Sequence, residues 1–239
     1  MRDSQSPPAV TMTETQARHR RATPTLSGVA GPISLRVCFW SFFSHASPRV
    51  IAVVFLATVA CLAGYASWSW WDLLIPAIVF TVEPFTEWII HVGLLHFRPR
   101  TIQGVRLDPL VARKHRAHHA NPKDVSLIFI PMPALVFLIG GLAATFLLTT
   151  ALSYALSGLS AAYAMALTYE WTHFLIHSPY RPRHRLYRYV WRAHRNHHFR
   201  NEHYWFGVTM HLADHVLGTF PDVTAVELSP TARTLGADG

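Results

Sequence analysis

The chain has 239 residues, of which 51% are hydrophobic and only 14% are charged. Soluble domains usually carry about 25% charged residues, so this composition favours a membrane protein over a soluble one. The formal net charge of +8 comes from arginines that flank apolar segments without forming a separate basic patch, which argues against nucleic acid as a partner.

The N-terminal part divides into a polar tail and a short apolar segment. Residues 1–30 are rich in Ser, Thr, Pro, Arg and Gln, which predicts a disordered basic tail, and they lack the pattern of a cleaved signal peptide. Residues 33–43 are apolar and aromatic around Arg36, as is typical of an interfacial helix. Two cysteines, Cys38 and Cys61, are too few for a disulfide framework, and we expect them in or near the membrane.

Three charge-poor stretches follow. Residues 50–71 contain no charge and are long enough to cross a hydrocarbon core of roughly 30 Å. Residues 73–90 are apolar except for Glu83 and Glu87, which share a helical face and should point toward the protein interior or lie near the membrane interface. Residues 125–169 are charge-free, and 45 residues are too many for one span. We expect two helices there, joined near residues 156–158.

The predicted fold is therefore an all-α, multi-pass integral membrane protein with four transmembrane helices in two hairpins. The expected spans are about 50–68, 72–91, 132–154 and 158–177, within a domain at 31–220 that a C-terminal tail at 221–239 follows. The turns within the hairpins carry no charge, whereas arginines gather in the other connections. The positive-inside rule then places both termini and a helical cap on the cytoplasmic side. A soluble all-α core would need shorter apolar helices.

Two matching histidine motifs lie in the cap segments, at residues 91–119 and 173–198. His115-Arg116-Ala117-His118-His119 has a copy at His194-Arg195-Asn196-His197-His198. Residues three and four apart share a helical face, so the histidines of each copy can converge on a transition metal. Ahead of each copy a Glu-Trp pair leads to two more histidines. Ten imidazoles exceed the four to six ligands of one ion, so they predict a shared cage for two.

Several kinds of metal protein contain clustered histidines. A structural zinc site uses four ligands, usually with cysteine, and a zinc hydrolase uses about three ligands and a carboxylate base, so neither explains ten histidines. A metal transporter should place its ligands along a path inside the membrane span. Two histidine-ligated irons suit O2 activation and attack on an unactivated C–H bond, which no side chain achieves alone. Spacing does not separate hydroxylation from desaturation.

These motifs resemble those of the fatty acid hydroxylase superfamily, the membrane di-iron oxygenases that act on fatty acids, sterols and carotenoids. The resemblance covers about residues 75–220. The motifs that carry it are His91-x4-His96, His115-x2-His118-His119, His173-x3-His177, His194-x2-His197-His198, Phe206-Gly207-Val208-Thr209 and Asp214-x3-Gly218-Thr219. The first motif and the Ala120-Asn121-Pro122-Lys123-Asp124 run before Phe129-Ile130-Pro131 are most similar to the fatty acid 2-hydroxylase branch.

The resemblance implies an oxidoreductase of the monooxygenase type, with two iron ions and O2 as co-substrate, that hydroxylates a membrane lipid. The expected product is a fatty acyl chain hydroxylated at carbon 2. Hydroxylation or desaturation of a sterol, carotenoid or other isoprenoid is the alternative, and a metal-binding or transport protein is a more distant one. Zinc can replace iron in purified samples. Since no cytochrome b5 domain precedes the bundle, electrons should come from a separate ferredoxin, cytochrome b5 or reductase.

The resemblance also assigns residues. The implied metal ligands are His91, His96, His115, His118, His119, His173, His177, His194, His197 and His198. Metal-bound imidazoles usually donate their other N–H to an acceptor. The candidates for that acceptor role are Glu87, Glu170 and Asp214, and Tyr169 is a candidate for lining the pocket; the alternative for each is an ordinary interfacial residue. His203, His211 and His215 could extend the histidine network. We expect His19, His45 and His184 on the surface.

Overall fold

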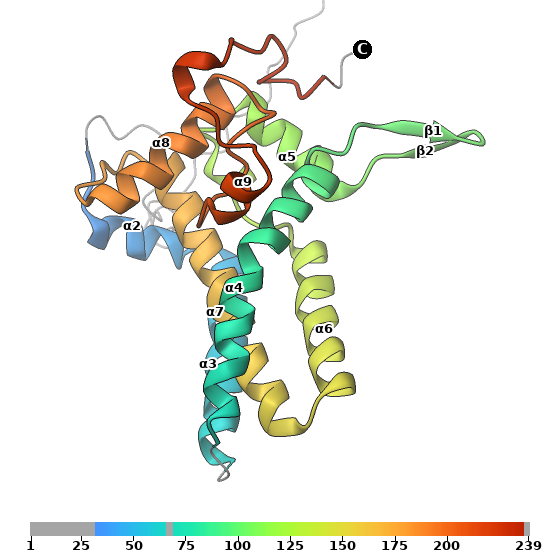
Figure 1. Ribbon diagram of the computed structural model, residues 1–239, viewed down its shortest axis with the longest axis vertical. Coiled ribbons are helices and arrows are strands. Elements are labelled where there is room, and N and C mark those ends of the chain that lie inside the picture. Colours follow the sequence, from blue (N-terminus) through green and yellow to red (C-terminus); the bar gives the residue numbers. More distant parts are fainter. Residues whose placement is uncertain (1–31, 66–68, 237–239) are drawn as a thin grey trace, which may run out of the picture.

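Four long helices run side by side in this computed structural model, which describes residues 32–65 and 69–236, and shorter helices form a cap at one end (Figure 1). The long helices are α3 (Ala46–Gly64), α4 (Trp71–Ile90), α6 (Met132–Thr149) and α7 (Leu152–His177). The cap contains a π-helical turn, η1 (His91–Leu95), with α5 (Leu110–Ala120), α8 (Arg185–Phe199) and α9 (Leu212–Val216). Short 3₁₀ turns lie at η2 (Val125–Leu127) and η3 (Val223–Ala225).

Three segments, not the expected four, are long and apolar enough to cross a membrane within the described ranges: Ala46–Gly64, Trp71–Leu95 and Val125–Thr149. Their outward side chains are apolar, and Phe137 and Leu148 are 80% and 84% exposed. The fourth predicted span, α7, contains more small and polar residues because α3, α4 and α6 all pack against it. Ser157 of α7, for example, donates a hydrogen bond to Asp72 of α4 at 2.8 Å.

The connection between α6 and α7 also differs from the prediction. It lies at residues 150–151, ahead of the expected turn near 156–158. Gly158 is inside α7 and allows α6 to approach, because a Cβ there would lie 2.2 Å from the Phe146 ring. The turn was therefore expected at the wrong place because a glycine that permits close helix packing looks the same in the sequence as a glycine that forms a turn. α3 and α4 each contact α7 more extensively than each other, so the bundle is centred on α7 and is not built from two paired hairpins.

A short antiparallel ribbon corrects the expectation of a purely α-helical fold. β1 (Arg100–Ile102) pairs with β2 (Val105–Leu107) and projects from the side of the cap (Figure 1). Gln103 and Gly104 both have positive φ, 49° and 79°, as a two-residue hairpin turn requires. Strands of three residues are too short to show a sequence alternation.

Helix α2 (Leu35–Phe42) occupies the segment expected to be interfacial. Its Cys38 and Phe42 are buried in a core with Phe174 of α7, whereas Leu35 and Trp40 are 48% and 63% exposed. Cys61 is exposed on the apolar helix α3.

The segment after α9 packs on the cap. Val226, Ala232 and Leu235 are buried, and the Ser229 backbone N–H donates to the Arg200 carbonyl at 2.7 Å. The residues expected to form a C-terminal tail therefore cover part of the histidine-bearing helices up to residue 236. The predicted N-terminal tail lies outside the described residues.

Candidate metal centre

The π turn at the end of α4 explains the spacing of the first histidine motif. Residues five apart point in different directions on an α-helix, but the wider π turn closes a hydrogen bond from the His96 N–H to the His91 carbonyl at 3.0 Å. The two rings thereby approach to 4.9 Å between centroids. His173 and His177, which are four apart, need only the regular α-helical turn of α7, and their centroids also lie 4.9 Å apart.

The ten predicted histidines gather into two groups of five, and within each group the nitrogen atoms that could bind a metal all lie within 4.8 Å of one another. The first cluster is His91, His96, His115, His119 and His197. The second cluster is His118, His173, His177, His194 and His198. Each half of the chain therefore supplies four members of one cluster and one member of the other. His118 from the first half lies in the second cluster, and His197 from the second half lies in the first cluster; we call these two the exchanged histidines.

The nitrogen atoms within each cluster approach as closely as ligands of one ion. In the first cluster, His115 Nε2 lies 3.1 Å from His91 Nε2 and 3.2 Å from His119 Nε2. In the second, His118 and His177 are 3.2 Å apart at their Nε2 atoms. Two nitrogens at right angles around an ion with bonds of about 2.1 Å would lie about 3.0 Å apart. The donor set and its spacing therefore fit one transition-metal ion per cluster.

Backbone carbonyls hold four of the histidines by their Nδ1 atoms. The pairs are His91 with Phe206 at 2.6 Å, His119 with Ala232 at 2.8 Å, His173 with Ile128 at 3.1 Å and His197 with Tyr204 at 2.8 Å. A carbonyl can only accept, so each of these rings carries its proton on Nδ1. Its Nε2 lone pair then faces the cluster. The Nε2 atoms of His173 and His197 are buried and have no hydrogen-bond partner among the described residues.

Burial keeps these imidazoles neutral. It lowers the pKa of His118 and of His194, and neighbouring histidines lower both further. Burial likewise lowers the pKa of His119 to about 3, although its bond to the Ala232 carbonyl opposes the shift. Neutral imidazole is the form that binds metals, so the cap holds its histidines ready for ligation at neutral pH.

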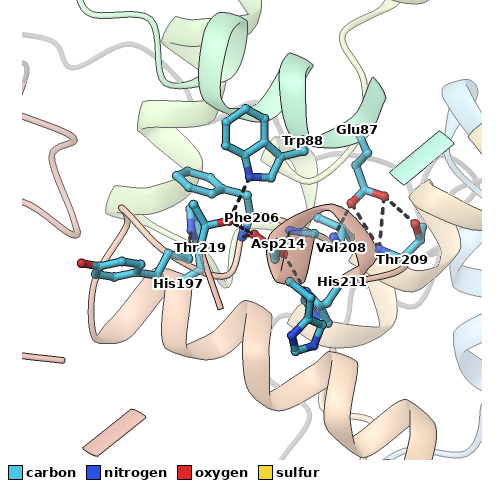
Figure 2. A network of polar contacts seen from close by, with 12 residues as sticks. Glu87, Trp88, His197, Phe206, Val208, Thr209, His211, Asp214 and Thr219 are labelled. Carbon is cyan, nitrogen blue, oxygen red and sulfur yellow. Dashed lines mark hydrogen bonds and ion pairs between the residues drawn. The ribbon is translucent and has the colours of Figure 1, made fainter. Parts of the chain in front are cut away.

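Two carboxylates, Glu87 and Asp214, hold the loop at residues 206–209 (Figure 2). This loop supplies the Phe206 carbonyl that accepts from His91. Asp214 accepts from the Phe206 N–H at 3.0 Å and the Gly207 N–H at 2.8 Å. Glu87 accepts from the N–H groups of Val208 and Thr209. All four backbone N–H groups of this loop are thus bound by two carboxylates from α4 and α9.

Asp214 is fixed by further donors. Thr219 Oγ1 donates to it at 2.6 Å and itself accepts from the Trp88 indole N–H at 3.0 Å (Figure 2). Burial alone would raise the pKa of Asp214, but hydrogen bonds from His211, Thr219 and the Gly207 N–H outweigh it and hold that pKa below its ordinary value. The carboxylate is therefore ionised and remains a strong acceptor for the loop.

Glu170 repeats this arrangement at the second cluster. It accepts from the Ile130 N–H at 2.9 Å, and the Ile128 carbonyl accepts from His173. Glu87 likewise binds the N–H of Val208, two residues after the carbonyl that accepts from His91. In both halves, a glutamate on a long helix binds a backbone N–H of a loop. The carbonyl two residues earlier in that loop orients a histidine, which lies on the same helix in the case of His173 and in the π turn that follows the helix in the case of His91.

This geometry differs from the expectation that Glu87, Glu170 and Asp214 accept directly from ligand histidines. For the four histidines whose Nδ1 acceptor the structure shows, that acceptor is a backbone carbonyl. The carboxylates instead bind backbone N–H groups of the loops that supply two of these carbonyls. The reason is steric: each carboxylate lies behind the loop and not behind the imidazole ring. Sequence reasoning found the carboxylates because of their helical spacing from histidines. It could not find the carbonyls, which leave no side-chain signal.

The remaining candidates lie around the clusters. The Tyr169 ring is 5.7 Å from that of His173. His203, His211 and His215 belong to neither cluster. The polar partners of their imidazole rings are, in that order, Glu202 at 3.5 Å, Asp214 at 3.0 Å and the Tyr189 hydroxyl at 2.7 Å.

Two of the three histidines expected on the surface lie in the described ranges. His184 is exposed, whereas His45 is half-buried, with its ring 4.4 Å from that of Phe129, so its predicted exposure was wrong. Its position at the start of α3, beneath the loop that contains Phe129, explains the burial. His19 lies outside the described residues.

The chain is similar to known proteins in both sequence and fold. Residues 76–219, more than half of the chain, match the family described as Fatty acid hydroxylase. Two Arabidopsis thaliana proteins, dihydroceramide fatty acyl 2-hydroxylases FAH2 and FAH1, are each 27% identical to this chain, over 82% of its length and 83% and 82% of theirs. The solved structure "Full length scs7p (only hydroxylase domain visible)" shares the fold, with a TM-score of 0.64 and 22% identity over 77% of this chain and 68% of that one. All ten clustered histidines lie in the matched region, whereas Ala232 lies beyond it.

Proposed function

We propose, from the premise that this chain belongs to the fatty acid hydroxylase family and is an oxidoreductase, that it is an O2-dependent di-iron oxygenase acting on a membrane lipid. The observation that carries the proposal is the pair of five-histidine clusters at the ends of long apolar helices. An all-nitrogen cage suits iron, and its position beside apolar helices suits a lipid substrate.

We assign one iron to each cluster, with all ten clustered histidines as ligands. Bound iron would supply the redox chemistry that activates O2 for attack on an unactivated C–H bond. The protein orients the ligands: the Nδ1–H groups of His91, His119, His173 and His197 donate to carbonyls, so that Nε2 faces the metal. Full burial of His118, His194 and His198 keeps bulk water from the cage.

The reaction converts R–H, O2, two electrons and two protons into R–OH and water. The electrons must come from outside the substrate, because hydroxylation removes only two of the four that O2 needs. We propose a separate electron-transfer protein, a ferredoxin, cytochrome b5 or reductase, as their source.

The proposed substrate is an acyl chain, and the proposed product carries its hydroxyl at carbon 2. The clusters lie where the long helices meet the cap, close to headgroup level, while the tail of a lipid points toward the bilayer centre (Figure 1). Carbons near the carboxyl end would therefore reach the metals first. The names of the two Arabidopsis relatives, which describe 2-hydroxylases of dihydroceramide acyl chains, support the same position.

The proposed topology has four spans, with α7 as the fourth. A helix of 26 residues is long enough to cross a bilayer, and its polar residues can be shielded by the three helices packed around it. The arginines concentrate in the cap segments, which supports a cytoplasmic location for the cap and both termini.

Lipid analysis of a host with a defined lipid composition tests this function. Expression of the intact chain should produce acyl species heavier by one oxygen, with fragmentation placing the oxygen beside the carbonyl, and a His118→Ala control should not. Unchanged acyl chains together with a modified sterol or carotenoid would overturn the substrate and leave the metal centre standing. An iron content near one ion per chain, together with activity that survives loss of the histidines from either half of the chain, would overturn the di-iron assignment.

A further inference from the structure

A basic groove of about 620 Å³ lies on the outside of the cap, between the end of α7 and helix α8. Its wall includes four arginines: Arg181 from the loop after α7, and Arg188, Arg192 and Arg195 from α8. The three arginines on α8 are four and three residues apart and therefore share one face of that helix. The groove is separate from the metal clusters, because His194, His197 and His198 project from a different face of α8.

These arginines form no ion pair with a carboxylate in the described part of the chain, although Asp222 lines an adjoining pocket with Arg188 and Arg192. Helix α8 itself contains no acidic residue. Arg188, Arg192 and Arg181 are exposed, while the Arg195 guanidinium lies 4.7 Å from the centre of the Trp191 ring. Like charges held together without counter-ions repel one another, so an anion in the groove would be favourable.

The surroundings of the groove indicate where such a ligand comes from. Pro32, three residues before the start of α2, also lines the groove. The outward side chains of α2 are apolar and aromatic, and Phe39 and Trp40 are 46% and 63% exposed, as expected for a helix at the membrane interface. Tyr187 of α8 packs on the core that α2 forms with α7, so the groove lies directly beside this interfacial helix.

We propose that this groove binds the phosphate of an anionic phospholipid headgroup. Arginine clusters on the cytoplasmic side of membrane helices attract such lipids, and guanidinium groups match phosphate geometry. A lipid fits better than an acidic carrier protein, because α2 places the groove at the edge of the bilayer. The proposal rests on the membrane topology proposed above but not on hydroxylation, so loss of lipid binding and loss of hydroxylated product are separate readouts.

Native mass spectrometry of the full-length, metal-loaded protein in neutral detergent measures this binding directly. Phosphatidylglycerol is the probe, phosphatidylcholine is the zwitterionic comparison, and inorganic phosphate is the competitor. The Arg188→Gln/Arg192→Gln variant should bind phosphatidylglycerol about 25-fold more weakly, since each arginine near an anionic headgroup contributes about five-fold. The control Arg106→Gln/Arg183→Gln removes the same net charge from exposed arginines outside the groove and should bind normally.

Three results would overturn the proposal. Equal weakening by both double variants would mean that net charge, not the groove, attracts the lipid. Displacement of the lipid by inorganic phosphate at comparable concentration would assign the groove to a soluble phosphate. Full lipid binding by the groove variant, together with slower reduction of the iron by an acidic carrier, would make this face a protein-docking surface. Metal content equal to that of the parent protein shows that the variants are folded.

Discussion

At the scale of single residues, the proposed metal centre assigns metal ligation and ligand orientation to different groups. The carbonyls of Phe206, Ile128, Tyr204 and Ala232 fix the rings without bringing negative charge next to them. A carboxylate in the same place would make the ligand more basic and reduce the net positive charge of the site. The carboxylates instead hold the loops, so that an all-neutral histidine set surrounds each proposed ion.

The two exchanged histidines provide the most direct test of the ligand assignment. We expect His197→Ala and His118→Ala each to lower turnover more than about 100-fold, since losing a partner that only orients a ligand already costs about 10–100-fold. Each is the single member that one half of the chain contributes to the other cluster. The measurement is product formation per chain in isolated membranes.

His184→Ala is the matched control, because His184 is exposed and outside both clusters. All three variants should insert into membranes with unchanged helix content, since lipid-facing burial comes from the long helices. Near-normal turnover in either cluster variant would contradict the assignment of that histidine.

The glutamates that hold the loops should each affect one metal. Glu87→Met leaves the Val208 and Thr209 N–H groups without an acceptor, which costs about 1–3 kcal/mol and frees the loop behind His91. We expect metal affinity at the first cluster to fall about 10–100-fold, and Glu170→Met to do the same at the second. Metal titration of the apo full-length protein measures both.

Glutamine at either position keeps one carbonyl oxygen and should restore most of the affinity. Glu227→Gln, an exposed change, should have no effect. Equal loss from both clusters in Glu87→Met would indicate general destabilisation and refute a role confined to His91.

At the scale of elements, α7 organises the bundle, and its contact with α6 depends on one glycine. We expect Gly158→Ala to destabilise the protein by about 1–3 kcal/mol, because the new Cβ would overlap the Phe146 ring and force the helices apart. Thermal unfolding in detergent measures the change. Gly140→Ala on α6 is the control: nothing lies within 4 Å of its added Cβ, so stability should be equal or higher.

If the overlap is the cause, Phe146→Leu combined with Gly158→Ala should recover stability. Additive destabilisation in that double variant would contradict the packing explanation.

The C-terminal segment is a second element whose role can be tested, because the Ala232 carbonyl accepts from His119. A chain ending at residue 228 should bind metal at the first cluster about 10–100-fold more weakly, since His119 loses the group that orients it. Metal analysis after dialysis is the measurement. A chain ending at residue 236 retains every described contact and should match the intact protein. Unchanged metal retention in the chain that ends at residue 228 would exclude a role for this segment.

At the scale of the whole molecule, metal removal should affect the cap more than the bundle. The close Nε2 contacts within each cluster join nitrogens that a cation would bridge, and an ion that binds only the folded state stabilises it. We expect about two ions per chain, and a lower melting temperature after chelation with most helix content kept, measured by metal analysis and circular dichroism. Re-addition of iron should restore the melting temperature. An unchanged melting temperature would mean that the clusters do not stabilise the cap.

The sequence by itself determined which side chains gather in the two histidine clusters and which segments are apolar. Helical periodicity brings His115, His118 and His119 to one face without any other part of the chain, and lipid burial follows from composition alone. Local geometry of this kind is encoded within a few residues. For that reason the ten histidines, the duplicated motif and the apolar spans α3, α4 and α6 were all predictable.

Only the tertiary structure decided how the two halves combine. The exchange of His118 and His197, the carbonyl behind each ring, and the central position of α7 all depend on contacts between distant segments, such as His91 with Phe206 and His119 with Ala232. A backbone carbonyl is present at every residue, so no letter of the sequence marks the one that accepts a bond. In the sequence, Gly158 is equally compatible with a turn and with close helix packing. Only the position of Phe146 in the structure distinguishes these two roles.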